Sequence, residues 1–278
     1  MKKISRRSFL AAAAVSAAAL ALTACGGSAS SAASSVASSA ASSEAVSSAA
    51  AAELTTVEAG KLTMATNATF PPYEMTTDSG EIEGIDVDTA KAIAEKLGLE
   101  LQIYVMEFDA ALLSVQQGNA DIVMAGVTVT DERKAVMDFS DSYATGIQSI
   151  IVPNDSDIAS PDDLAGKKIG TQRGTTGYIY CSDDFGEDSV VAYDSGLTAV
   201  QALNNGQVDA VVIDNAPATE YVAANPGLKV LDTSYAEEDY AIGMAKGSAL
   251  EDAVNKALEE LKADGTLQAI VDKYINAN

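Results

Sequence analysis

Few side chains in this sequence could carry out catalysis, and those that could hold a charged group are gathered in short polar motifs. The chain of 278 residues contains no histidine and 2 cysteines. This excludes His-based catalysis and the commonest zinc ligand. A Gly-Thr-Thr-Gly loop at 174–177 follows a predicted strand at 168–170, which is a good setting for an anion beside exposed N–H groups. Alone this loop is weak evidence, because Gly-Thr turns are frequent.

The paired and clustered acids are interpreted as structural. Asp86 and Asp88 have the spacing of a catalytic pair, but they open a predicted helix. There Asp86 can cap the first turn, and Asp88 adds favourable charge. The acidic runs at 183–184 and 237–239 are predicted to be solvated surface and are assigned no chemistry.

The first 24 residues are predicted to be a cleaved signal peptide. Four basic residues precede a mainly Ala and Leu stretch at 9–22, which is shorter than the about 20 apolar residues of a membrane-spanning helix. The sequence Leu-Thr-Ala-Cys at 22–25 resembles the bacterial lipobox, so Cys25 is predicted to be lipidated (a palmitate-bearing lipoprotein) and to become the mature N-terminus. Residues 5–10 also resemble a twin-arginine signal, which leaves Sec and twin-arginine export both open.

Residues 25–53 are expected to form the lipidated cysteine and a disordered tether. Positions 28–52 are almost entirely Ser and Ala and can bury little, although an Ala-rich helix is an alternative. Without the signal, 13 Lys and Arg face 40 Asp and Glu, a net charge of −27, which argues against nucleic acid as a partner. With Cys25 lipidated, Cys181 has no disulfide partner. The sequence thus predicts a protein anchored by lipid on the extracytoplasmic face of the cell membrane.

The elements that must position the polar motifs follow an α/β pattern. From residue 61 onward, short apolar runs alternate with helical periodicity. One helix opens near Asp86 and ends at Gly98, with a core-facing apolar stripe between them. An apolar, apolar, Gly, Asp pattern spaced by three residues occupies 112–121 and recurs 88 residues later at 200–209. Each copy predicts a helix–turn–strand unit, so two similar lobes are implied unless the repeat is a coincidence.

The ends of the two repeated strands are the expected place for a ligand. In open parallel α/β sheets, ligands bind beyond the carboxyl ends of the strands. Those ends are Gly126 and Asp214. If both units face one crevice, residues after each strand meet a ligand from opposite sides.

Three motifs in this order resemble the polar-amino-acid family of bacterial extracellular solute-binding proteins. They are Gly-Ile-Asp-Val-Asp at 84–88, Ala-Gly-Val-Thr-Val-Thr-Asp-Glu-Arg at 125–133, and the loop at 174–177. The resemblance spans nearly everything from 61 to 275. Thr89 stands where the family usually has an aliphatic residue, a departure that concerns helix packing and not the pocket.

The resemblance implies a two-lobed, periplasmic-binding-protein-like α/β fold of type II, with a ligand cleft between the lobes. Lobe 1 is expected to comprise 60–147 plus 240–278, and lobe 2 is expected to comprise 148–239. The two chain crossings that form the hinge are expected near 147–152 and 240–244, where apolar segments lead from lobe to lobe.

The resemblance also implies how an amino acid is held, since a dry cleft must pair the ligand's carboxylate and ammonium. A planar guanidinium can grip both carboxylate oxygens. The residues expected at the carboxylate are Arg133, Thr128, Thr175 and Thr176. The ammonium is expected at Asp214 and the Gly126 carbonyl. Alternatively, Arg133 is a solvated residue at a helix start, and Asp214 forms an Asx-type turn, a role that can coexist with binding the ammonium.

Five further residues are expected around the ligand side chain, although each could equally belong to the core. They are Asn67, Phe70, Tyr73, Phe108 and Gln172. The two Phe rings would sandwich the aliphatic part of the ligand. Relatives that bind strongly basic ligands often carry an acid at the position of Asn67, so its neutrality favours a neutral polar amino acid or broad specificity.

The function implied is the extracellular substrate-binding component of an amino-acid ABC importer, which takes up a polar L-amino acid by hinge closure. Its expected partners are the free amino acid and the ABC permease and ATPase, and the protein is expected to be a monomer with no metal or cofactor. A sensory ligand-binding subunit is the alternative. An enzyme on the same fold is a weaker one, because the sequence lacks histidine and an activated nucleophile.

Overall fold

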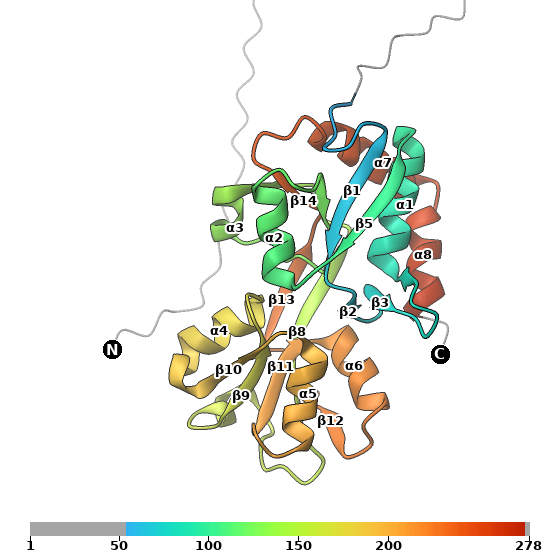
Figure 1. Ribbon diagram of the computed structural model, residues 1–278. Coiled ribbons are helices and arrows are strands. Elements are labelled where there is room, and N and C mark those ends of the chain that lie inside the picture. The colour runs from blue at the N-terminus through green and yellow to red at the C-terminus, as the bar shows by residue number, and fades with distance from the viewer. Residues whose placement is uncertain (1–53, 276–278) are drawn as a thin grey trace, which may run out of the picture. The chain divides into compact units, whose positions relative to one another are not determined.

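The computed structural model describes residues 54–275, so the predicted signal peptide, lipidated Cys25 and tether lie outside the described residues. The described part forms two larger β-sheets, each with helices packed against it, and one small three-stranded sheet (Figure 1). The predicted α/β class is confirmed. None of the helices within 54–275 combines the length and apolar character needed to cross a membrane.

The first sheet has the strand order β5-β1-β6-β14-β7, with β1 parallel to β5 and β6, and β14 antiparallel to β6 and β7. In β1, Leu62 and Met64 pack in the core cluster of α1, whereas Ala65 packs in the cluster of α2, because successive strand residues face opposite sides. Helices α7 and α8 pack against α1. The strands and helices of this part are β1 (Lys61–Thr66), α1 (Ile85–Leu97), β5 (Glu100–Val105), α2 (Phe108–Gln116), β6 (Ile122–Val123), α3 (Asp131–Val136), β7 (Met137–Phe139), β14 (Gly243–Ala245), α7 (Glu251–Ala263) and α8 (Thr266–Ile275), and the small sheet adds β2 (Thr69–Phe70), β3 (Glu74–Thr76) and β4 (Ile82–Glu83).

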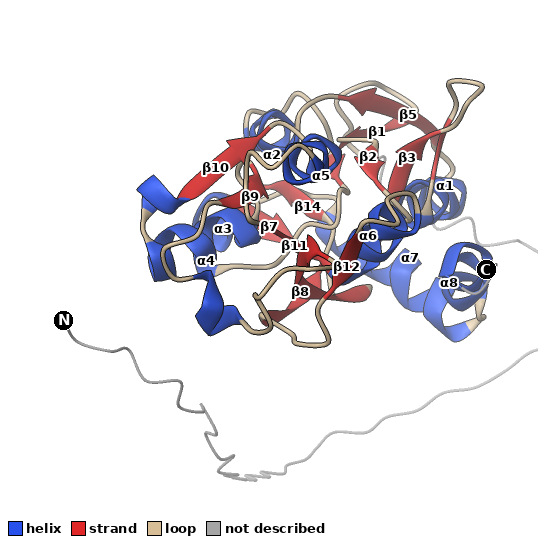
Figure 2. Ribbon diagram, turned by 90° about the horizontal axis from the view of Figure 1, so that it is seen from below, coloured by secondary structure: helices blue, strands red, loops and turns tan. Residues whose placement is uncertain are grey.

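The second sheet has the order β10-β9-β11-β8-β12, and β13 pairs with β8. Val211 packs with the residues of α5, and Val212 packs with Cys181 of α4 on the other face. Cys181 is buried and free. Figure 2 shows this sheet and its helices from below. The elements are β8 (Ala144–Pro153), a 3-10 turn (Pro161–Leu164), β9 (Ile169–Gln172), α4 (Thr176–Phe185), a second 3-10 turn (Glu187–Ser189), β10 (Val190–Tyr193), α5 (Gly196–Asn204), β11 (Ala210–Asp214), α6 (Asn215–Ala223), β12 (Leu228–Val230) and β13 (Ala236–Tyr240).

The repeat seen in the sequence is confirmed as two equivalent units, α2–β6 in the first sheet and α5–β11 in the second. Both helices end in a turn whose glycine has a positive φ, 72° in one unit and 67° in the other. The acid before each strand plays the same part. Asp121 accepts the N–H of Thr63 at 2.7 Å, and Asp209 accepts the N–H of Lys168 at 2.8 Å. Each strand is thereby fixed to the chain beside it.

The chain passes between the two sheets twice, at 140–143 between β7 and β8 and at 241–242 between β13 and β14. The predicted crossing at 240–244 contains the second passage. Residues 147–152, where the other crossing was expected, lie inside β8 and pair with β11 and β12. Their apolar run belongs to the core of the second sheet.

The start of α1 differs from the prediction. Gly84, not Asp86, is the N-cap residue, and no side chain caps this helix. The Asp86 carboxylate is completely buried and accepts the Gly126 N–H at 2.9 Å and the Tyr143 hydroxyl at 2.7 Å. The interpretation of Asp86 as a residue explained by the helix start is therefore wrong. The predicted end of the helix at Gly98, with φ of 70°, is confirmed.

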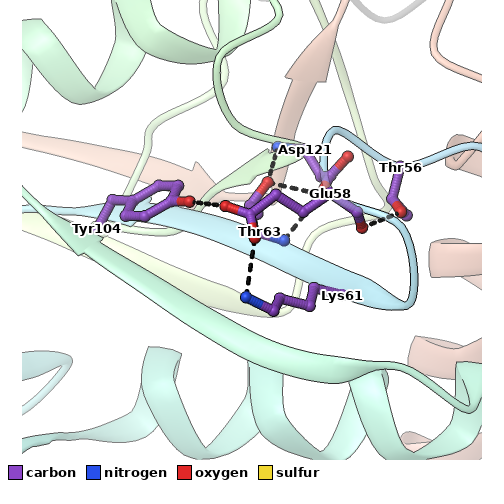
Figure 3. Close-up of polar contacts among 6 residues, drawn as sticks. All are labelled: Thr56, Glu58, Lys61, Thr63, Tyr104 and Asp121. Atoms are coloured by element: carbon purple, nitrogen blue, oxygen red, sulfur yellow. Dashed lines mark hydrogen bonds and ion pairs between the residues drawn. The ribbon is translucent and has the colours of Figure 1, made fainter.

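The segment that leads into β1 is tied to the first sheet (Figure 3). Glu58 accepts bonds from Lys61 Nζ at 2.8 Å and from the Tyr104 hydroxyl on β5. The N–H of Val57 donates a hydrogen bond of 2.8 Å to the carboxylate of Asp121, which directly precedes β6. The chain therefore enters the fold held against three strands of one sheet.

Candidate ligand-binding site

A small cavity is lined by strand residues of the second sheet and of the small sheet and by residues that follow strands of the first sheet. The structure brings ten of the eleven predicted site residues together around it, namely Asn67, Phe70, Phe108, Gly126, Thr128, Arg133, Gln172, Thr175, Thr176 and Asp214. Gly126 follows β6 closely and Asp214 ends β11, as expected for ligands bound beyond the carboxyl ends of strands. The sequence analysis missed two lining residues, Glu74 and Ala125.

Tyr73 is the predicted residue that the structure places outside the lining of this cavity. It is buried, with its ring centroid 6.0 Å from that of Phe70 and 5.2 Å from that of Tyr240, which it meets edge-on. Edge-to-face packing of this kind fixes ring positions. Tyr73 therefore links the Phe70 ring to Tyr240 within the core.

Arg133 lies in the first turn of α3, where the Thr130 hydroxyl accepts its N–H at 3.2 Å. Only 8% of the residue is exposed, so the alternative of a solvated helix-start residue is wrong. Its Nη1 donates to the Thr128 carbonyl at 2.7 Å, its Nη2 donates to the Gly174 carbonyl at 3.1 Å, and the guanidinium lies 5.4 Å from the Phe108 ring centroid.

No carboxylate of residues 54–275 forms an ion pair with Arg133. Burial lowers the pKa of the guanidinium, although the charges of Glu238 and Asp214 act in the opposite direction. Arg133 has five N–H groups, and the two bonds to carbonyls leave others for a further acceptor. The chemistry that this arrangement offers is the binding of an anion.

The loop at 174–177 presents the start of α4 to the same cavity. Thr175 is the N-cap residue: its hydroxyl accepts the N–H of Tyr178 at 3.3 Å and donates to the Gln172 carbonyl at 2.8 Å. Thr176 is the first residue of the helix, where backbone N–H groups lack acceptors within the helix and favour an anion. The anion setting predicted for this loop thus lies beside Arg133.

Asp214 lies at the end of β11 and holds two hydrogen bonds. The Tyr240 hydroxyl donates to Oδ1, and Gln148 Nε2 donates to Oδ2 at 2.8 Å. Its side chain makes no cap bond to α6, so the Asx-type turn is wrong. Burial raises the pKa of the Asp214 carboxyl to about 7, and the charge of Glu238 adds to this, while the Tyr240 bond opposes it. A buried carboxylate with no cation beside it favours a cationic group in the cavity.

Glu238 is a functional candidate that the sequence analysis missed. The prediction that 237–239 is solvated surface is wrong for this residue, which is 6% exposed while its two neighbours point outward. The alternation of strand β13 explains the difference. Oε2 of Glu238 accepts the Thr128 hydroxyl at 3.1 Å and Gln148 Nε2 at 3.0 Å. The Thr128 hydroxyl has a single proton, which it donates to Glu238. The backbone N–H of Thr128 is therefore the donor that this residue can offer to a ligand.

Glu74 is the second acid missed. It begins β3, lines the cavity and is 0% exposed, and neither of its oxygens has a hydrogen-bond donor among the described residues. Burial raises the pKa of the Glu74 carboxyl well above its ordinary range, and the charge of Asp86 raises it further. The acid directly follows the apolar run from Phe70 to Tyr73, and that position was the available sequence signal.

Several hydrogen bonds between described residues join the parts of the chain that carry the two larger sheets, among them the bond from the Thr128 hydroxyl to Glu238. Besides the bond from Arg133 to the Gly174 carbonyl, Gln172 Nε2 donates to Asn67 Oδ1 at 3.2 Å. The Tyr221 hydroxyl of α6 donates to the Thr69 carbonyl of β2 at 2.5 Å, and Tyr221 does not line the cavity. The structure is therefore closed over the site.

The chain matches the family model of the bacterial extracellular solute-binding proteins, family 3, over residues 62–277. It is 33% identical over 225 residues to the L-cystine-binding protein TcyJ of Escherichia coli (strain K12), which covers 80% of this chain and 85% of that protein. The solved arginine-, lysine-, histidine-binding protein ArtJ of Geobacillus stearothermophilus gives a TM-score of 0.75 at 35% identity, covering 78% of this chain and 96% of that chain.

An ancestral arginine-binding protein has been solved both with arginine and with glutamine. Each structure gives a TM-score of 0.74 and covers 78% of this chain and 98% of that chain, at 43% identity for the arginine complex and 42% for the glutamine complex. These likenesses confirm the expected two-lobed fold of the periplasmic-binding-protein type.

Proposed function

The chain belongs to family 3 of the bacterial extracellular solute-binding proteins, and from this we propose that it is the extracellular substrate-binding component of an ABC importer for a basic L-amino acid such as arginine. One observation carries the proposal: the cavity holds a buried guanidinium, which forms no ion pair within residues 54–275, together with two buried acids, Asp214 and Glu74. These are the complements of an amino acid that bears a carboxylate, an ammonium and a cationic side chain.

The proposed binding mode assigns one group of the cavity to each charge of the ligand. Arg133 and the N–H groups at Thr128, Thr175 and Thr176 hold the carboxylate, because charge-assisted and bidentate bonds are the strongest available there. The ammonium pairs with Asp214 and the Gly126 carbonyl. Phe70 and Phe108, which both line the cavity, enclose the aliphatic part, with Asn67 and Gln172 beside it.

The preference for a basic ligand comes from Glu74. The neutrality of Asn67 favoured a neutral amino acid, but that inference did not include a buried acid four residues after Phe70. A basic ligand supplies the counter-charge that an ionised Glu74 needs in this buried site, whereas without a cation burial holds the acid in its neutral form and raises its pKa. Relatives that carry arginine in their names, including one solved with arginine bound, agree with this choice.

Isothermal titration calorimetry of the protein against arginine, lysine, histidine, glutamine and cystine tests the proposal. Arginine or lysine is expected to bind most tightly. A thermal-shift series should rank the ligands in the same order, since a ligand at about 100 times its Kd stabilises by roughly 2.7 kcal/mol. Absence of binding to every amino acid tried would reject the function itself.

Asp214→Asn is expected to weaken amino-acid binding by about 100-fold, because the amide keeps the shape of the side chain but removes the charge that pairs with the ammonium. Calorimetry of the variant measures this. Asp183→Asn, at an exposed position on α4, is the matched control and should bind as the unmodified protein does. Equal affinity of Asp214→Asn and the control would exclude the ammonium assignment.

We further propose that the two sheets form the cores of two lobes, which meet at the passages 140–143 and 241–242 instead of the bounds expected near 147 and 240, and which close on the ligand about these passages. Closure excludes water and strengthens the ion pairs around the ligand. Bonds between the lobes outside the cavity should then favour the closed state without touching the ligand.

Tyr221→Phe tests this closure. Loss of its bond to the Thr69 carbonyl should destabilise the closed form by about 1 kcal/mol and weaken arginine binding roughly fivefold. Tyr178→Phe is the control, since no hydrogen bond of the Tyr178 hydroxyl occurs within residues 54–275. The readout is the Kd by calorimetry, and a Kd unchanged by Tyr221→Phe would contradict a role in closure.

The cellular setting completes the proposal. The protein acts as a monomer, without a catalytic activity, a metal or a cofactor, and delivers its ligand to an ABC permease with its ATPase. Residues 1–24 are removed as a signal peptide, and Cys25 carries the lipid that holds 25–53 and the fold at the extracytoplasmic face of the membrane. Incorporation of labelled palmitate that is lost in Cys25→Ala tests the anchor, and loss of arginine uptake on gene deletion separates transport from sensing.

A further inference from the structure

Glu74 is surrounded by acids and tyrosines. Burial is the largest cause of the raised pKa of its carboxyl, and the charges of Asp86 on α1 and Asp214 on β11 raise this pKa further. Burial raises the pKa values of Tyr73, Tyr143 and Tyr221, and the charge of Glu74 adds to the rise at each of them. The cationic side chain lining the same cavity, Arg133, donates to the carbonyls of residues 128 and 174 and forms no ion pair with Glu74. The side chains within residues 54–275 that interact electrostatically with Glu74 are therefore acids and tyrosines, and none of them is a cation.

The neighbouring acids Glu74 and Asp86 differ in what can stabilise their charge. Burial raises the pKa of the Asp86 carboxyl to about 6, and the hydrogen bonds that it accepts from the Tyr143 hydroxyl and the Gly126 N–H act in the opposite direction. Glu74 accepts no hydrogen bond from the described residues and has no contact with solvent, and its interaction with the Asp86 carboxyl raises the pKa of Glu74 while it acts to lower that of Asp86. Two buried carboxyl groups without a cation cannot both ionise at low cost, and the proton goes to the one with fewer donors. In the empty site that acid is Glu74.

A basic ligand and a neutral ligand make opposite demands on this proton. A guanidinium has only donors and keeps its charge, so it needs Glu74 as a carboxylate that can accept two N–H bonds. The O–H of a protonated Glu74 would instead oppose the ligand's N–H groups. A neutral side chain that ends in an amide or urea carbonyl suits the protonated form, which donates its O–H to that carbonyl.

We propose, on the basis of the function proposed above, that Glu74 releases its proton to solvent when a basic amino acid binds and keeps it when a neutral amide-bearing amino acid binds. The acidity of the medium then selects between the two ligand classes at one site. No bond other than the O–H of Glu74 breaks, and the proton passes to buffer while the ligand's own cation replaces it.

The direction of the pH dependence follows from linkage. Below the pKa of Glu74 in the empty site, arginine must displace a proton, so its affinity rises with pH by up to about tenfold per unit. Citrulline has the length of arginine with a neutral urea end, and its affinity gains nothing from the loss of this proton. The ratio of arginine to citrulline affinity should therefore fall as the medium becomes more acidic.

Calorimetry of the full chain with arginine and with citrulline, in phosphate and in Tris at one pH, measures the protons released by each ligand. The heat of buffer protonation differs between these buffers, so the difference in apparent enthalpy gives the number of protons. Proton release from Asp214, whose pKa is raised to about 7, is common to both ligands and cancels in the comparison. Arginine should release close to one proton more than citrulline.

Equal proton release by the two ligands would overturn the coupling while leaving the binding function in place. Failure of every basic amino acid to bind would overturn the binding function and the coupling with it. Both outcomes are read from the unmodified protein, so neither depends on a variant that folds.

Glu74→Gln imitates the protonated acid and gives an independent test. It should bind citrulline within about twofold of the unmodified protein, bind arginine roughly 100-fold more weakly, and show no pH dependence of the arginine-to-citrulline ratio. Glu81→Gln, which removes an exposed acid from the same region, should leave the pH-dependent ratio intact. A Glu74→Gln protein whose ratio still changes with pH would contradict the assignment to Glu74.

Discussion

Arg133→Ala is expected to weaken amino-acid binding by 100-fold or more, a loss of about 3 kcal/mol. The reason is that the guanidinium is buried beside the cavity without an ion-pair partner in residues 54–275, so the carboxylate of a bound ligand would lose its counter-charge. The side chain donates to two loop carbonyls but is not part of a hydrophobic core. The fold should therefore survive, and calorimetry of the folded variant measures the loss.

Arg173→Ala is the matched control for this prediction. Arg173 lies on the loop that carries Gly174, but its side chain is 54% exposed and its contact with Asp194 is a long surface pair at 3.7 Å. Pairs of this kind contribute little, so the control should change affinity less than twofold. Arg133→Lys should recover only part of the binding, because an ammonium cannot form the planar two-point contact. Normal affinity in Arg133→Ala would remove the carboxylate assignment.

Gly84→Ala is expected to lower the free energy of unfolding by about 3 kcal/mol or more. Gly84 has a φ of 138°, which other residues rarely adopt, and an added Cβ would lie 2.1 Å from the Tyr73 carbonyl oxygen. Conformational strain and a clash with backbone therefore add together. The close approach exists because the N–H groups of Ile85 and Asp86 bond to the carbonyls of Pro72 and Tyr73. Denaturant unfolding monitored by circular dichroism measures the change.

Gly80→Ala separates the clash from the strain. Gly80 also has a positive φ, of 85°, but an added Cβ would have no atom within 4 Å. Its substitution should cost only about 1 kcal/mol. If Gly84→Ala proved no worse than this control, the contact with the Tyr73 carbonyl would be flexible enough to give way, and the expected clash would be refuted.

The sequence was sufficient to locate the cavity because its residues follow the ends of recognisable elements. Gly126 and Asp214 come after strands of a repeated helix–turn–strand unit, and the start of α4 carries its own Gly-Thr signal. Where the chain direction of a strand is known, the position of its carboxyl end is known as well. The burial of Arg133 was not visible in this way, because its carbonyl partner Gly174 is 41 residues away.

The acids that matter most beside the cavity were assigned wrongly or missed, for a common physical reason. Glu238 lies in a run of three acids that resembles a solvated surface, and only its pairing with β8 shows which of the three points inward. Asp86 has the position of a helix cap, but its donors are 40 and 57 residues away. An acid that is buried by contacts with residues far away in the sequence leaves no local pattern. Composition and spacing therefore favour the interpretation that such an acid is exposed to solvent.

The attachment of residues 56–63 to the first sheet has a mechanical consequence. Glu58 is bonded to Tyr104 of that sheet (Figure 3), and the N–H of Val57 is bonded to Asp121 directly before β6. The second sheet is joined to the first through the passages at 140–143 and 241–242. A force applied from the N-terminal side therefore enters the first sheet and does not act across the hinge. In the closure proposed above, the first lobe is held from its N-terminal side and the second lobe is free to move.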